Sequence, residues 1–130
     1  MELREIISKL QEAFKRDDVK KAVLGSDWYK KNLDSGIHST GFCYAASEVI
    51  YRLDGGKEKW KKVAISEANW TLGGHCYLEN KLTGDILDIT AEQYLLMDIE
   101  IPYNKGKGGG FRTNDFGNKA KLLAEMSGLI

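Results

Sequence analysis

The chain has 130 residues, of which 42% are hydrophobic and 29% are charged, and its formal net charge is zero. These values are typical of one soluble globular domain, here spanning residues 1–130, with enough chain for a single core. Because no overall field attracts a polyanion, neither nucleic acid nor an anionic membrane is expected as a partner.

The N-terminal segment predicts an amphipathic helix rather than a signal peptide. It is charged throughout, and its apolar residues recur at helical spacing: Leu3, Ile6, Ile7, Leu10 and Phe14. No apolar run in the chain approaches the roughly 18 residues that span a bilayer. A cytoplasmic protein is therefore expected, in which the two cysteines remain free thiols.

Two shorter helices are predicted next. Residues 17–24 form one that closes at Gly25, and residues 27–35 form another that ends at Gly36. Glycine is the residue that most readily ends a helix in the left-handed conformation, so both stops have a physical basis.

A buried helix is predicted over Phe42–Leu53, where the stretch FCYAASEVIYRL places apolar residues on one face. Ser39 or Thr40 would cap its N-terminus with a side-chain oxygen. Cys43 would then lie in the first turn, where unpaired N–H groups and a partial positive charge favour a thiolate. The alternative is that Cys43 is a small buried residue of the core.

The pattern then changes to short strands. Residues 61–69, 75–80 and 85–90 are rich in β-forming residues and are separated by glycine-containing turns, with NKLTG as a hairpin loop. Helices followed by a meander and a last helix indicate an α+β domain. The N-terminal helices and the cysteine-bearing helix should pack on a small antiparallel β-meander.

The C-terminal part of the chain is predicted to be less regular. Thr90 would cap a helical turn within TAEQYLLM, and the glycine-rich residues 104–115 would form a flexible loop that could cover a substrate. The last helix is expected to begin near Asn114 or Asp115.

A histidine and an aspartate come together if the hairpin pairs Glu79 with Gly84. That register sets Tyr77 opposite Ile86 and His75 opposite Asp88. Residues that face each other across strands have Cβ atoms about 4.5–5.5 Å apart, so Asp88 could orient the imidazole. The other ring nitrogen could then take a proton from a thiol, unless the pair is only an exposed cross-strand contact.

Strand alternation sends Cys76 to the face opposite His75, toward the predicted core. Adjacent strand residues therefore cannot converge on one ion, and the sequence has no C-x-x-C pair for zinc. Neither a metal site nor a cofactor is predicted.

Three blocks of the sequence resemble the core of papain-like and transglutaminase-like thiol enzymes, whose chain order is Cys, His, then Asp or Asn. The blocks are GFCYAASEVIYRL, GGHCYLEN and GDILDITAEQY. Tyr77 stands where the transglutaminase-like pattern H-x-W-x-E has tryptophan, and DIT matches its D-x-T. The chain length and the closing helix KAKLLAEM are similar to those of small YunG-like proteins of bacteria.

The resemblance implies a role for each residue of the trio. Cys43 would be the nucleophile, His75 the general base and later the acid, and Asp88 the residue that orients His75. The implied reaction is acyl transfer at an amide, as in peptide or isopeptide hydrolysis, deamidation or a transglutaminase-like transfer. The implied partner is a protein or peptide that carries the amide.

Papain-like enzymes have a glutamine shortly before the cysteine, which completes the oxyanion hole, and this glutamine is missing here. The corresponding stretch here is GIHSTGF, so His38, Ser39, Thr40 or backbone N–H groups would have to serve. Trp70 and Tyr77 are candidate cleft residues, while Trp28 and Trp60 are assigned to the core or its edge. The alternative function is an inactive member of the same fold that binds another protein.

Overall fold

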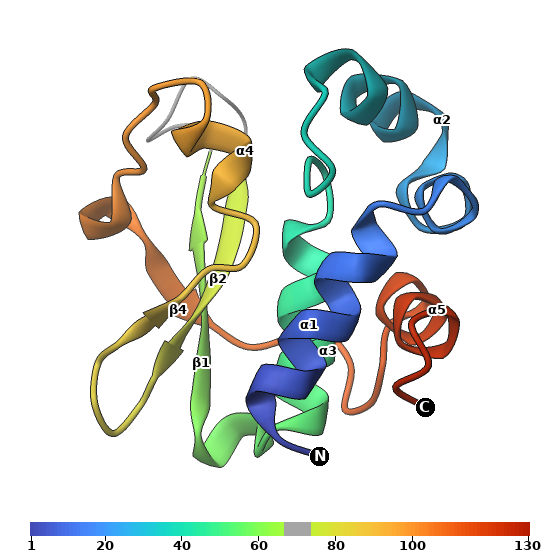
Figure 1. The fold of residues 1–130 in the computed structure, drawn as a ribbon. Coiled ribbons are helices and arrows are strands. Elements are labelled where there is room, and N and C mark those ends of the chain that lie inside the picture. The colour runs from blue at the N-terminus through green and yellow to red at the C-terminus, as the bar shows by residue number, and fades with distance from the viewer. Residues whose placement is uncertain (67–73) are drawn as a thin grey trace.

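The computed structural model describes residues 1–66 and 74–130 and confirms an α+β architecture. Its antiparallel sheet has the strand order β3-β2-β1-β4 (Figure 1). The helices are α1 (Leu3–Phe14), α2 (Asp17–Ser35), α3 (Cys43–Leu53), α4 (Glu92–Leu95) and α5 (Asn118–Met126). The strands are β1 (Trp60–Ile65), β2 (His75–Asn80), β3 (Ile86–Leu87) and β4 (Lys107–Gly109), and the 3-10 turns are η1 (Gly56–Glu58) and η2 (Tyr103–Lys105). In the described ranges, no helix combines the length and apolar composition that crossing a bilayer requires.

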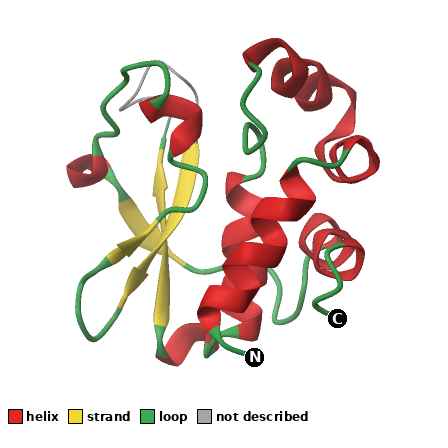
Figure 2. Cartoon of the chain, in the orientation of Figure 1, coloured by secondary structure: helices red, strands yellow, loops and turns green. Residues whose placement is uncertain are grey.

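The long helices lie on one side of the sheet, and α3 is the innermost of them (Figure 2). α3 contacts β2 on one side and α1 and α5 on the other. Its Phe42, Ala46, Val49 and Ile50 are essentially inaccessible to solvent, as predicted for a buried helix. A second apolar cluster holds Val63, Ile65 and Tyr77 of the sheet against Tyr94 and Ile101.

The N-terminal helices agree with the sequence in their bounds and in their breaks. α1 covers the predicted apolar stripe. The two predicted helices that follow form one kinked segment, α2, because Gly25 adopts φ 76° and ψ 168° inside it. Gly36 ends α2 in the left-handed conformation, with φ 68°. Glycine is needed at both positions because a Cβ penalises positive φ.

The predicted cap of α3 is wrong. Phe42 occupies the N-cap position, and no side chain caps the helix. Ser39 lies one turn earlier, where its carbonyl oxygen accepts a hydrogen bond from the Phe42 N–H at 3.1 Å. Thr90 does not cap α4 either, because Ala91 holds that position.

The register of the hairpin differs from the prediction by two residues. Glu79 lies opposite Ile86 rather than Gly84, and Leu78 lies opposite Leu87. The cause is the turn, in which the Asn80 side chain accepts hydrogen bonds from the N–H groups of Leu82 and Thr83. A shift of two keeps every side chain on its predicted face, because strand side chains alternate with a period of two.

The glycine-rich residues 104–115 are only in part the loop that their composition predicts, since the only continuous stretch among them without helix or strand is residues 110–115. Residues 107–109 form β4, which pairs with β1 at the edge of the sheet. A Cβ on Gly106 would collide with the Tyr77 hydroxyl and the Val63 side chain, so glycine allows the close approach. α5 also begins later than predicted, at Asn118.

Candidate active site

Cys43 is the first residue of α3 and is half-buried. The turn before it is held by the buried Asn32, whose amide donates hydrogen bonds to the carbonyl oxygens of His38 at 2.9 Å and Thr40 at 2.8 Å. Gly41 adopts φ 91° and packs against Trp28. This turn positions the thiol at a helix N-terminus that no side chain caps.

His75 and Asp88 form the predicted pair, joined by a direct contact between their side chains. The Nε2 atom of His75 lies 2.6 Å from Oδ2 of Asp88, and both side chains are almost fully buried. If it continued past Leu87, the observed register would set Thr90 opposite His75. Asp88 therefore reaches the ring from the diagonal position, which is within reach for a side chain on the same face.

Asp88 is itself held in place by two further donors. The Tyr103 hydroxyl donates to Oδ2 at 2.9 Å, and the Thr90 hydroxyl donates to Oδ1 at 3.4 Å. Tyr103 comes from η2, far from Asp88 in sequence. A buried carboxylate needs such donors, since an unpaired buried charge is strongly unfavourable.

The electrostatics of His75 favour the protonated ring. Burial lowers its pKa, but the hydrogen bonds to Asp88 and to the Cys43 side chain and the charges of both groups outweigh burial, so the pKa is raised to about 9. The Cys43 side chain therefore acts directly on His75. At neutral pH this arrangement supports an imidazolium that can stabilise a neighbouring thiolate.

Tyrosines enclose the pair. The ring of Tyr94 meets that of His75 edge-on, with centroids 5.0 Å apart. Burial raises the pKa of Tyr94 and of Tyr103, and raises that of Tyr77 to about 12. All three phenols thus remain neutral at physiological pH.

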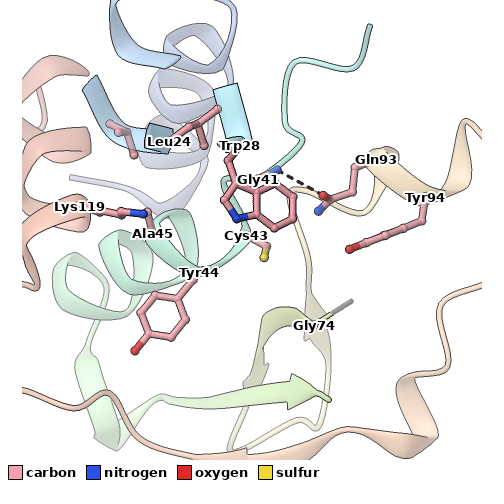
Figure 3. A pocket seen from close by; sticks show the side chains of 11 residues that line it. Leu24, Trp28, Gly41, Cys43, Tyr44, Ala45, Gly74, Gln93, Tyr94 and Lys119 are labelled. Carbon is pink, nitrogen blue, oxygen red and sulfur yellow. Dashed lines mark hydrogen bonds between the residues drawn. The ribbon is translucent and has the colours of Figure 1, made fainter. Parts of the chain in front are cut away.

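A cavity of about 260 Å³ opens beside Cys43 (Figure 3). Its walls combine Val23 and Leu24 of α2 with Ala45 of α3, and Lys119 of α5 lines it as well. Trp28 lines it too and is 43% exposed, so of the two predicted places, the core or its edge, it lies at the edge. Trp60 is buried as predicted.

Gln93 also lines this cavity, and the sequence did not identify it. It is only 5% exposed, and its Oε1 accepts a hydrogen bond from the Gly41 N–H at 3.4 Å. Its Nε2 has no hydrogen-bond partner within the described ranges. An unsatisfied buried donor costs about 1–3 kcal/mol.

The remaining candidate residues are placed as follows. Ser39 is fully buried and is not part of the cavity lining. Thr40 lines an adjoining groove with Gln93, and its hydroxyl lies 3.0 Å from that of Ser35. Tyr77 is buried and donates to the Tyr103 carbonyl oxygen at 3.2 Å, away from the cavity. Trp70 lies outside the described residues.

Cys76 is buried as predicted, and burial raises its pKa to about 12, so its thiol stays protonated. Of the two cysteines, only Cys43 lines the cavity. Where the chain is described, no three His, Cys, Asp or Glu side chains are grouped as a metal would require.

Two residues of the site carried no local sequence signal. Tyr103 follows Pro102 in an irregular segment, and Gln93 lies five positions after Asp88, where the resemblance assigns no role. Both reach the site only through tertiary packing.

Compared with family models, with curated proteins and with solved structures, the chain matches none of them.

Proposed function

We propose that this protein is a cysteine-dependent enzyme that transfers an acyl group from an amide. Cys43 is the nucleophile, His75 the general base and then the acid, and Asp88 the residue that orients the imidazole. The observation that carries the proposal is the buried His75–Asp88 contact of 2.6 Å, with the pKa of His75 raised in part by Cys43.

In the first step, Sγ of Cys43 attacks the amide carbonyl carbon, and the carbonyl electron pair moves to oxygen. His75 gives its proton to the leaving nitrogen as the C–N bond breaks, which leaves a thioester. Because Asp88 engages Nε2, the proton exchanged with the thiol and the leaving group moves through Nδ1.

A second nucleophile then cleaves the thioester, and His75 takes its proton. Water gives hydrolysis of a peptide or isopeptide, or deamidation when the leaving group is ammonia, and an amine gives a transglutaminase-like transfer. The three outcomes share the same chain residues and differ only in leaving group and acceptor.

The test is alkylation of Cys43 by iodoacetamide between pH 5.5 and 9, in a Cys76→Ala background. The thiolate is the reacting form, so an ordinary thiol slows about tenfold per pH unit below about pH 8.5. We expect the Cys43 rate to stay high at pH 6.5 and to drop at least tenfold there in His75→Ala.

The control variant is His38→Gln, which removes the chain's other histidine and keeps an acceptor for Nζ of Lys20, which lies 2.9 Å from the His38 ring. Its alkylation profile should match the parent. A Cys43 rate that falls like that of an ordinary thiol and is indifferent to His75 would refute the enzyme and favour an inactive, protein-binding member of the fold.

A further inference from the structure

The unsatisfied amide of Gln93 is the strongest feature that the thiol–imidazole pair does not account for. Gln93 is buried, it lines the cavity beside Cys43, and its Nε2 lacks a hydrogen-bond partner among the described residues. Figure 3 shows its amide end turned toward Trp28 and Cys43. A buried donor without a partner at a cavity wall can donate a hydrogen bond to an acceptor atom of a bound ligand.

The N-terminus of α3 provides a second donor at the same cavity. The first N–H groups of a helix have no partner within the helix, and here no side chain caps them. Cys43 is the first residue of α3, so its backbone N–H and its thiol lie on the same residue at the cavity wall.

We propose that Nε2 of Gln93 and the backbone N–H of Cys43 together bind the carbonyl oxygen of the substrate, as an oxyanion hole. This inference rests on the proposed function of Cys43. When the thiolate adds to the carbonyl carbon, the C–S bond forms and the π pair becomes a lone pair on oxygen. Both donors then face a full negative charge on that oxygen. When the tetrahedral intermediate collapses, the lone pair re-forms the C=O bond and the C–N bond breaks.

The contact with Gly41 keeps the Gln93 amide from rotating freely. Oε1 accepts from the Gly41 N–H, so Nε2 is the end left to the cavity. Gly41 precedes Cys43 by two residues, and the same hydrogen bond therefore ties α4 to the turn that positions the thiol. A donor that is fixed before the reaction needs no reorganisation when charge develops.

The experiment compares two reactions of Cys43 in the Cys76→Ala background. Acylation by 4-nitrophenyl acetate passes through a tetrahedral oxyanion and is followed by the burst of 4-nitrophenolate. Alkylation by iodoacetamide is a displacement at a saturated carbon and forms no oxyanion. Gln93→Leu should slow acylation on the order of 10²–10³-fold and change alkylation by less than about twofold.

A control and a stability measurement separate catalysis from structure. Gln11→Leu, at an exposed position of α1, should leave both reactions unchanged. Gln93→Leu removes the unsatisfied donor and also the acceptor of the Gly41 N–H, two effects of opposite sign on the free energy of unfolding, so its unfolding temperature should stay close to that of the parent.

Equal slowing of acylation and alkylation in Gln93→Leu would overturn the oxyanion role and assign Gln93 to positioning of the thiol. Unchanged acylation would overturn it as well. Failure of the proposed function looks different, because Cys43 of the parent would then alkylate as an ordinary thiol, indifferent to His75.

Discussion

At the scale of single residues, the site depends on the pKa of the buried His75 ring, which burial lowers and its charged partners raise. Burial alone would keep His75 neutral, and the contacts with Asp88 and Cys43 reverse that outcome. Asp88 can do so because Tyr103 and Thr90 fix its carboxylate. The protonation state of His75 is thus a property of its partners.

Asp88→Asn tests this balance. The variant removes the charge and keeps the shape, so burial is opposed only by Cys43 and the pKa of His75 should fall well below about 9. NMR titration of the ring protons measures it directly, since the chain has only two histidines. Asp85→Asn, in the exposed hairpin loop, is the matched control, and a His75 pKa that stays near 9 in Asp88→Asn would contradict the assignment.

At the scale of elements, the sheet depends on how closely β4 approaches β1. Gly106 and Gly108 leave room for the side chains of the neighbouring strands, among them Tyr77 and Lys61. The same segment leads from η2, which supplies Tyr103 to Asp88. The glycines of this segment therefore have a packing role that also affects the active site.

Gly106→Ala should destabilise the protein by about 1–3 kcal/mol, because its Cβ would collide with the Tyr77 hydroxyl and Val63. The measurement is the urea midpoint at constant m-value, which reports the free energy of unfolding. Gly110→Ala is the matched control, since its Cβ would meet nothing within 4 Å. Equal midpoints for the two variants would show that β4 does not pack as described.

At the scale of the whole molecule, the site lies where the two layers meet. α3 brings Cys43 from the helical layer, and β2 brings His75 from the sheet. Their interaction therefore exists only when the layers are packed together. Folding and the charge state of the site are linked for this reason.

The contribution of His75 to the stability of the protein should fall as pH rises from about 6.5 to 9. Below 6.5 the His75 ring is protonated in both the folded and the unfolded chain, so the full stabilisation is present. Between 6.5 and about 9 the folded state keeps a proton that the unfolded state releases, and the stabilisation is lost. A pKa difference of ~2.5 units corresponds to a change on the order of 3 kcal/mol.

Urea unfolding at pH 6 and pH 9.5 gives this difference. His75→Gln should show a clearly smaller difference, because it lacks the group that titrates, and His38→Gln should behave like the parent. A His75 ring that titrates near 6.5 in the folded parent, followed by NMR, would contradict the raised pKa of His75.

Sequence by itself determined the α+β class, the bounds of α1 and of most of α3, and the faces of β2. It also paired His75 with Asp88, because side-chain alternation survives a register error of two residues. Local patterns suffice where periodicity and glycine stops decide the conformation, as at Gly25 and Gly36.

Only the tertiary structure decided the pairing of β4 and the parts that Gln93 and Tyr103 play in the site, whereas the turn decided the hairpin register locally. The register followed from side-chain hydrogen bonds of Asn80 in the turn. The glycine-rich segment forms a strand because its glycine backbone can approach Val63 and Tyr77 closely. Composition alone does not reveal such a contact. Gln93 and Tyr103 reach the site from the short helices α4 and η2. No periodicity relates these helices to Cys43 or Asp88, because packing of distant parts of the chain brings them together.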